Sequence, residues 1–182
     1  MAYATARIRA NGCLVAAGRT NALEDEREFG AAMERVSAHR RAKVRAYRFR
    51  KDQALSLMAG LLLDELLAGF GLRERDMRFE EAQGGKPVFA NRPDLHFSLA
   101  HSERMAVAAL SRVPVGVDVE RLVGFPHDVA EPYLWTEMES VGKLIGCGVG
   151  AFVDSGDYRR PAHVEVEHFP LDDYLVCLAL QM

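Results

Sequence analysis

The strand that decides the fold of this chain reads Gly116-Val117-Asp118-Val119-Glu120. Its valines are apolar and β-branched, a composition that favours a β-strand. Successive side chains of a strand point to opposite faces, so we expect Asp118 and Glu120 to share one face. Two neighbouring carboxylates require a cation, unless both lie on the solvent-exposed face of an edge strand.

A second motif follows this strand and reads Trp135-Thr136-Glu137-Met138-Glu139-Ser140-Val141-Gly142-Lys143. Its pattern is helical, and Glu139 and Lys143 are four residues apart on one helical face. With Asp118 and Glu120, Glu139 completes a set of three carboxylates. Mg²⁺ prefers about six oxygens, usually one or two protein carboxylates with phosphate and water as the other ligands. The sequence therefore suggests a magnesium ion that holds a polyphosphate, whereas the alternative is an exposed Glu139–Lys143 pair.

Two motifs upstream of the strand carry groups that could bind phosphate. In Phe97-Ser98-Leu99-Ala100-His101-Ser102, His101 follows an apolar strand where a loop begins, a common place for functional groups. In Gly84-Gly85-Lys86-Pro87, the glycines permit a tight turn and close backbone approach, and the proline fixes the exit. Each motif also has a structural interpretation, because a lone histidine is more often structural and the lysine motif is a common turn.

A basic run from Arg40 to Lys51 contrasts with the formal net charge of −3. Arg40 and Lys43 share a helical face that could meet a phosphate, as a bidentate fork or a point charge. The alternatives are a solvated helix face and an RNA-binding patch. Tyr47 and Phe49, within the run, are expected to face the core. The acidic overall balance argues against a general nucleic-acid-coating protein.

The length of 182 residues allows one large domain or two small lobes. The three cysteines are far apart and form no CxxC pair, which indicates neither a disulfide framework nor a zinc site and fits a reducing cytoplasm. The N-terminus does not read as a secretory signal. The most apolar segment, residues 54–70, is interrupted by Asp64 and Glu65, so it predicts a core helix rather than a membrane span.

The pattern of hydrophobic residues predicts helices, then strands, then a helix, then strands, which is an α+β fold. We expect one helix from Leu23, capped by Asn21, to about Phe49. A second helix should run from Asp52 to about Phe70, with Gly71 ending it. A third is expected over residues 132–146.

Strands are expected on both sides of the third helix. A strand or hairpin is predicted near residues 5–17, and two antiparallel strands, 162–169 and 174–180, should close the chain. A meander of short strands is predicted over residues 77–79, 88–89, 95–99, 105–110 and 115–119.

Taken in order, the four motifs resemble those of the 4'-phosphopantetheinyl transferases of the surfactin-synthetase-activating type. The resemblance extends from about Val36 to about Gly148. It implies an enzyme of the holo-[acyl-carrier-protein] synthase type that moves the phosphopantetheine arm of coenzyme A to a serine of an apo acyl or peptidyl carrier protein. The reaction would require Mg²⁺ and release 3',5'-adenosine diphosphate. The carrier would serve fatty acid, polyketide or nonribosomal peptide synthesis.

The resemblance also implies an architecture and a location. The chain would be a cytoplasmic monomer, with no nucleic-acid or membrane partner. It would form two pseudo-symmetric lobes, residues 1–112 and 113–182, with the active site in the cleft between them.

Roles follow for the residues at matching positions. Asp118, Glu120 and Glu139 would hold Mg²⁺ on the pyrophosphate of coenzyme A, and Glu139 is also the candidate base for the carrier serine. Lys143 would stabilise charge on the phosphates, and His101 would contact the adenosine 3'-phosphate. The other residues expected to bind coenzyme A are Arg40, Lys43 and Ser56, at the same phosphate, and Lys86 and Pro87, near the nucleotide.

Three features depart from the family pattern. Met138 stands where the family usually has lysine, and Ala100 stands where a serine commonly precedes the histidine, beside the nucleotide. The segment between Glu120 and Trp135 is much shorter than usual, so part of the carrier-binding region is expected to be lost. These departures motivate an alternative, a non-catalytic homologue that binds coenzyme A or a carrier protein, although the retained carboxylates favour an active, compact transferase.

Overall fold

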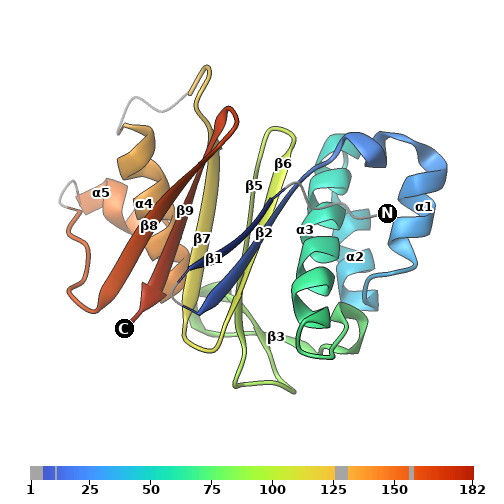
Figure 1. Ribbon diagram of the computed structural model, residues 1–182, viewed down its shortest axis with the longest axis horizontal. Helices are drawn as coiled ribbons and strands as arrows, with labels where there is room; N and C mark the ends of the chain where they lie inside the picture. Colours follow the sequence, from blue (N-terminus) through green and yellow to red (C-terminus); the bar gives the residue numbers. More distant parts are fainter. Residues whose placement is uncertain (1–5, 11, 126–130, 156–157) are drawn as a thin grey trace.

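The computed structural model describes residues 6–10, 12–125, 131–155 and 158–182 (Figure 1). Its α-helices are α1 (Glu26–Met33), α2 (Ala38–Ala46), α3 (Arg50–Ala68), α4 (Pro132–Ile145) and α5 (Gly150–Ser155). Short 3-10 helices are η1 (Asn21–Glu24), η2 (Glu74–Asp76) and η3 (Gln83–Gly85). The strands are β1 (Ala6–Ala10), β2 (Cys13–Arg19), β3 (Phe79–Glu81), β4 (Pro87–Phe89), β5 (His96–Ser102), β6 (Met105–Ser111), β7 (Val115–Arg121), β8 (Val164–Leu171) and β9 (Tyr174–Gln181). The mixture of helices and antiparallel strands agrees with the predicted α+β class.

Two antiparallel sheets form the middle of the molecule. One has the strand order β1-β2-β6-β5 and the other has the order β7-β9-β8, while β3 and β4 form a separate ribbon. The predicted closing pair is confirmed by the antiparallel pairing of β8 with β9. The prediction of a continuous meander is wrong, because β6 also pairs with β2, and β7 pairs with β9. Every residue of β6 is buried, so this strand requires a neighbour on each edge and cover on both faces.

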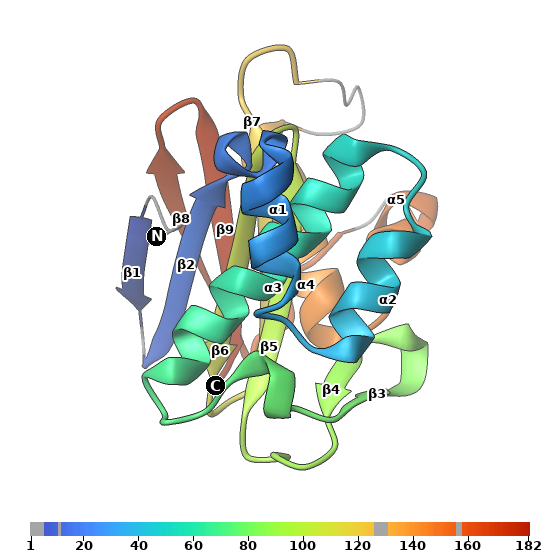
Figure 2. The same cartoon turned by 90° about the vertical axis from the view of Figure 1, so that its right-hand side faces the viewer.

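The sheets pack face to face, and each is covered on its other face by helices. Val115, Val117 and Val119 of β7 lie in the apolar core between the sheets, with side chains from β2, β6 and β9. The outer face of the four-stranded sheet packs against α3, on which α1 and α2 pack in turn, and that of the three-stranded sheet packs against α4. Figure 1 shows this order of layers, and Figure 2 shows α1–α3 in front of the sheets.

The alternation along β7 confirms that Asp118 shares a face with Gly116 and Glu120, opposite the buried valines. This face lies against α4. A Cβ atom at Gly116 would collide with the carbonyl oxygen of Ser140, so glycine allows the strand and the helix to approach closely. The close approach brings residues of α4 next to Asp118.

The prediction of a single helix from Leu23 to Phe49 is wrong, because two side-chain caps interrupt it. Asp25, rather than Asn21, caps α1, and its carboxylate accepts hydrogen bonds from the backbone N–H groups of residues 27 and 28, both at 2.9 Å. Ser37 caps α2 by accepting a hydrogen bond from the Arg40 N–H at 3.0 Å. Such caps give the backbone partners outside a continuous helix.

The predicted long helix is confirmed as α3, which is buried over most of its length. Most of its apolar side chains pack into the core beneath the four-stranded sheet. Gly71, just beyond the helix, has a φ of 69° and donates its N–H to the carbonyl of Ala68 at 3.0 Å. No helix among the described residues is both long enough and apolar enough to cross a membrane.

Candidate functional site

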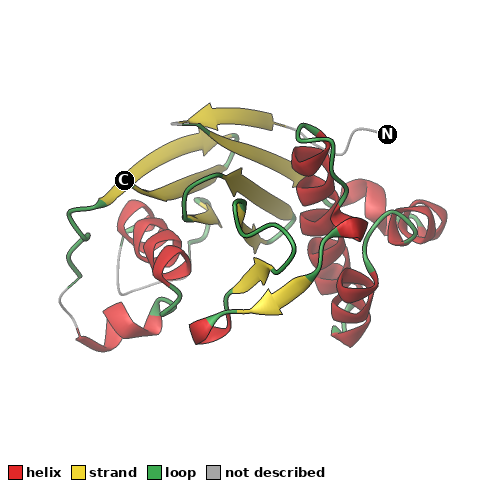
Figure 3. Ribbon diagram, turned by 90° about the horizontal axis from the view of Figure 1, so that it is seen from below, coloured by secondary structure: helices red, strands yellow, loops and turns green. Residues whose placement is uncertain are grey.

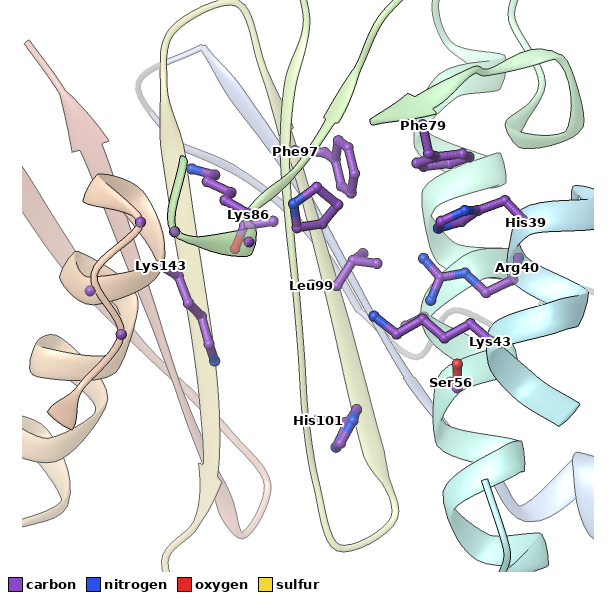
Figure 4. Close-up of a pocket in the computed structure, with 18 of the residues that line it drawn as sticks. His39, Arg40, Lys43, Ser56, Phe79, Lys86, Phe97, Leu99, His101 and Lys143 are labelled. Carbon is purple, nitrogen blue, oxygen red and sulfur yellow. The ribbon is translucent and has the colours of Figure 1, made fainter. Parts of the chain in front are cut away.

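A pocket with a cavity volume of about 300 Å³ lies between α2, α3, β5, the β3–β4 turn and α4. Figure 3 shows the β3–β4 ribbon between the α1–α3 group and α4. All six predicted coenzyme A residues line the pocket, and so does Lys143. Its charged and polar side chains include His39, Arg40, Lys43, Ser56, Lys86, His101 and Lys143 (Figure 4).

Arg40 is buried in the wall of this pocket, with only 4% of its surface exposed. It lies across Gly60 of α3, where an added Cβ would be 2.8 Å from Arg40 Cγ. Within the described part of the chain, Arg40 Nε and the buried Ser56 Oγ have no hydrogen-bond partner. A buried polar group without a partner costs about 1–3 kcal/mol. These two groups therefore fit a ligand that accepts hydrogen bonds.

Two further bases complete the positive end of the pocket. Burial and the charge of Arg40 lower the pKa of Lys43. His101 lies within β5, at the rim of the pocket, so the prediction that it follows the strand where a loop begins is wrong. Burial and the charge of Lys143 lower its pKa. Both pKa values are lowered, as expected when basic groups lie close together with no anion between them. Among the cations of the basic run, Arg40 is buried, whereas Lys43, Arg45, Arg48 and Lys51 are exposed.

Aromatic side chains that the sequence did not single out form another wall of the pocket. The rings of His39 and Phe79 stack with centroids 4.7 Å apart and an interplanar angle of 13°. Tyr47 also lines the pocket, and Phe49 is 61% exposed, so the prediction that both face the core is wrong. No signal in the sequence separates His39 and Phe79 from residues of the core.

Lys143 joins two of the predicted metal ligands. Its Nζ donates a hydrogen bond to Asp118 Oδ1 at 2.6 Å and lies 3.7 Å from Glu139 Oε2. Burial lowers the pKa of Lys143, but the charges of Asp118 and Glu139 outweigh this effect and raise it, so the ammonium stays charged. Burial raises the pKa of Asp118 despite the opposing lysine.

Glu120 is held to β5, and its charge also helps to raise the pKa of Lys143. Its Oε2 accepts a hydrogen bond from Ser102 Oγ at 2.7 Å. A second bond joins the same strands, because the Val117 N–H donates to Ser98 Oγ at 3.0 Å. Over residues 6–10, 12–125, 131–155 and 158–182, no three His, Cys, Asp or Glu side chains are grouped closely enough to hold a metal ion.

The carboxylates still have the chemistry that Mg²⁺ prefers. Asp118 is 4% exposed, and its Oδ2 has no hydrogen-bond partner among the described residues. A buried carboxylate oxygen without a partner fits a cation. All the candidate ligands are oxygens, the donor type that Mg²⁺ takes in proteins.

Lys86 lines the pocket, but its ammonium is directed elsewhere. Its Nζ donates hydrogen bonds to the carbonyls of Val115 at 3.0 Å and Leu144 at 3.1 Å. Burial lowers the pKa of Lys86 to about 8. In Figure 4 the side chain points toward β7 and α4. Lys86 therefore holds the turn before β4 against β7 and α4. Gly84 in the same turn has a φ of 81°, and its lack of a Cβ leaves room for the Gly146 carbonyl.

Two of the three departures from the family pattern, Ala100 and Met138, lie at positions that do not line the pocket. Ala100 packs in the core between the sheets, so a hydroxyl at this position would not lie near the pocket as expected. Met138 is 5% exposed and does not line the pocket. In the short segment between Glu120 and Trp135, residues 126–130 lie outside the described residues.

Comparison with known proteins finds similarity to 4'-phosphopantetheinyl transferases. A family profile described as "4'-phosphopantetheinyl transferase, N-terminal" matches residues 24–112. A 4'-phosphopantetheinyl transferase of Bacillus subtilis is 28% identical over 173 residues, which cover 81% of this chain and 75% of that protein. The 4'-phosphopantetheinyl transferase Sfp of Bacillus subtilis strain 168 is 28% identical over 148 residues, 68% of this chain and 66% of Sfp. One from Bacillus pumilus is 31% identical over 138 residues, 63% of this chain and 59% of that protein.

Proposed function

Because the chain belongs to the 4'-phosphopantetheinyl transferase superfamily, of the surfactin-synthetase-activating type, we propose that it transfers the phosphopantetheine arm of coenzyme A to a serine of an apo carrier protein. The enzyme would be of the holo-[acyl-carrier-protein] synthase type. Its carrier would be an acyl or peptidyl carrier protein of fatty acid, polyketide or nonribosomal peptide synthesis.

The pocket is the observation that carries this proposal. Arg40 Nε and Ser56 Oγ are buried in its wall without hydrogen-bond partners in the described chain. We assign the adenosine 3'-phosphate of coenzyme A to these groups, together with Lys43 and His101. A phosphate accepts hydrogen bonds from all four and favours the charged form of the bases.

The end of the site that carries Asp118, Glu139 and Lys143 would receive the pyrophosphate of coenzyme A. Asp118, Glu120 and Glu139 would hold Mg²⁺ there, and a bound magnesium ion neutralises charge on the phosphate oxygens. Lys143, which contacts Asp118 and Glu139, would add a positive charge close to the same oxygens. Lys86 would contribute indirectly, by holding the turn with Pro87 along the nucleotide side of the pocket.

The transfer breaks one bond and forms one bond at phosphorus. The carrier serine oxygen attacks the phosphorus that bears the pantetheine arm, and the bond from this phosphorus to the oxygen of the departing 3',5'-adenosine diphosphate breaks. The serine proton passes to the Glu139 carboxylate, and Lys143 stabilises the charge on the departing phosphate. A positioned base contributes about 10²- to 10⁴-fold, and orientation of the two reactants contributes an effective molarity of about 10⁵ M or more.

We further propose that residues 1–112 and 113–182 act as two lobes with the site between them. In support, the pocket is lined by His39 to His101 from the first range and by Gly142 to Gly148 from the second. Carrier binding would then complete the cleft.

The alternative is a homologue that binds coenzyme A without transferring its arm. It is favoured by one observation, that Glu120 bonds to Ser102 and Asp118 bonds to Lys143. In such a protein the carboxylates would serve as structural partners of these two side chains.

Intact mass spectrometry of apo carrier proteins distinguishes the two functions. A panel of carriers is incubated with the protein, coenzyme A and Mg²⁺, with EDTA in a parallel sample. We expect one carrier or more to gain the mass of the phosphopantetheine arm, and the gain to disappear with EDTA. If no carrier gains this mass although the protein binds coenzyme A, the non-catalytic alternative is correct.

A further inference from the structure

Glu74 is a completely buried acid that has no role in the proposed chemistry. It begins η2, and its exposed surface is 0%. One carboxylate oxygen accepts the backbone N–H of Ser37 at 2.5 Å, and the other accepts the Ser37 hydroxyl at 2.8 Å. Glu74 Oε1 also lies 3.9 Å from Nε of Arg40. The acid therefore lies directly behind the arginine that lines the pocket.

Glu74 restrains Arg40 at its backbone as well as at its side chain. The Ser37 oxygen that donates to Glu74 also accepts the Arg40 N–H at 3.0 Å, which caps α2. The first turn of α2 is thereby fixed to the carboxylate. The Arg40 side chain also lies against Gly60, where an added Cβ would be 2.8 Å from Arg40 Cγ and 3.1 Å from its Nε.

The carboxylate is itself held in place by α3. Asp64 accepts the backbone N–H of Glu74 at 3.0 Å and receives two hydrogen bonds from Arg73, at 2.9 and 2.6 Å. A series of hydrogen bonds thus runs from α3 through η2 to the first turn of α2. Burial raises the pKa of Glu74 and lowers that of Arg40, and each group opposes the shift of the other.

We propose that Glu74 is a positioning residue that holds the Arg40 guanidinium for a terminal phosphate and so sets the preference for coenzyme A over 3'-dephospho-coenzyme A. This inference rests on the proposed function, which assigns Arg40 to the 3'-phosphate. An arginine has many rotamers, and ordering it in advance lowers the entropy that binding would otherwise cost. Glu74 does not itself form a hydrogen bond with Arg40 Nε, because the 3.9 Å between Glu74 Oε1 and this nitrogen is too long for one.

The test is the substitution Glu74→Gln in the full chain, with calorimetric titration of coenzyme A and of 3'-dephospho-coenzyme A. A carboxamide can accept from only one of the two Ser37 donors and turns an N–H group toward the other. We expect coenzyme A to bind about tenfold more weakly while 3'-dephospho-coenzyme A changes about twofold or less. The control is Asp76→Asn, an exposed acid in the same turn, for which we expect both affinities to be unchanged.

Opposite outcomes of this titration have distinct meanings. If Glu74 acts only as a competing negative charge, its removal tightens coenzyme A binding and overturns the proposal. Equal weakening of both ligands also overturns it, because a purely structural role does not distinguish a phosphate from a hydroxyl. Failure of the unsubstituted protein to prefer coenzyme A would instead refute the assignment of Arg40 in the proposed function.

A second variant keeps the test decisive if Glu74→Gln does not fold. Ser37→Gly removes the hydroxyl between Glu74 and the Arg40 N–H, and glycine at a helix N-cap costs only a few tenths of a kcal/mol relative to serine. We expect the preference for coenzyme A to fall in this variant as well. An unchanged preference in folded Ser37→Gly would overturn the proposal.

Discussion

Lys86 holds the turn before β4 against β7 and α4 through hydrogen bonds to the carbonyls of Val115 and Leu144. Lys86→Met removes both bonds and keeps most of the aliphatic volume. We expect the free energy of unfolding to fall by about 1–3 kcal/mol, the usual cost of buried groups left without partners. Urea denaturation measures this change, and Lys51→Met, at an exposed position of α3, is the control.

The same lysine predicts a pH dependence of stability. Burial lowers the pKa of Lys86 to about 8 from its ordinary value of 10.5. Between these values the unfolded chain binds more protons than the folded protein, so the contribution of Lys86 to stability increases as the pH rises from about 8 to 10.5. The difference in unfolding free energy between the unsubstituted protein and Lys86→Met should widen over this range. A constant difference would contradict the predicted shift.

Glu139 is the residue on which the proposed chemistry depends most directly. Glu139→Gln keeps the size of the side chain but removes the base, so we expect transfer to slow by about 10²- to 10⁴-fold with little change in folding. The rate is measured from the mass gain of an apo carrier. Glu167→Gln, an exposed acid of β8, is the matched control. Full activity in Glu139→Gln would rule out Glu139 as the base.

The sequence predicts which residues line the pocket better than it predicts their contacts. Arg40, Lys43 and His101 do lie in one pocket, as their resemblance to a phosphate-binding set implied. The hydrogen bonds from Lys86 to two backbone carbonyls were not predictable, because every residue has a backbone carbonyl and no residue type marks the ones that a lysine reaches. Glu74 was also missed, since its partners come from another helix and its burial depends on the packed fold.

At the scale of secondary structure, the contact between β7 and α4 sets the distance between the acids. Gly116→Ala would place a Cβ against the Ser140 carbonyl and 2.6 Å from the Leu144 nitrogen. We expect a loss of about 1–3 kcal/mol of stability from overpacking, together with reduced transfer, because Asp118 and Glu139 would move apart. Thermal unfolding and the carrier assay measure the two effects.

Gly30→Ala is the control for this substitution. Gly30 lies in α1, where an added Cβ would have no atom within 4 Å. Alanine should stabilise this helix by about 0.5–1 kcal/mol. Equal stability of Gly116→Ala and the unsubstituted protein would show that the strand and helix can separate without cost.

Local patterns predict the elements whose neighbours are apolar. The repeating hydrophobic residues of α3 and the alternation of β7 are strong signals because one face of each is buried. The break between α1 and α2 depends instead on the side chains of Asp25 and Ser37, whose capping competes with a continuous helix. Strand order is harder still, because β2 meets β6 across more than 80 residues of intervening sequence.

At the scale of the whole molecule, both sheet faces are covered within a single chain. The described apolar cores lie between the sheets and beneath the helices. We therefore expect a monomer of 20.2 kDa in solution, as the family resemblance implies. Light scattering coupled to size-exclusion chromatography measures the mass, and a mass near twice this value that depends on concentration would refute the expectation.

The two bonds between β5 and β7, Val117 N–H to Ser98 and Ser102 to Glu120, join the strand that carries His101 to the strand that carries Asp118. Two rigid strands joined in this way cannot slide along each other. We therefore expect the separation between the proposed phosphate-binding end and the acidic end to be largely set before a ligand binds. A ligand whose two phosphate groups are spaced differently could occupy one end of the proposed site but not both, so the site would select its ligand by the distance between these groups.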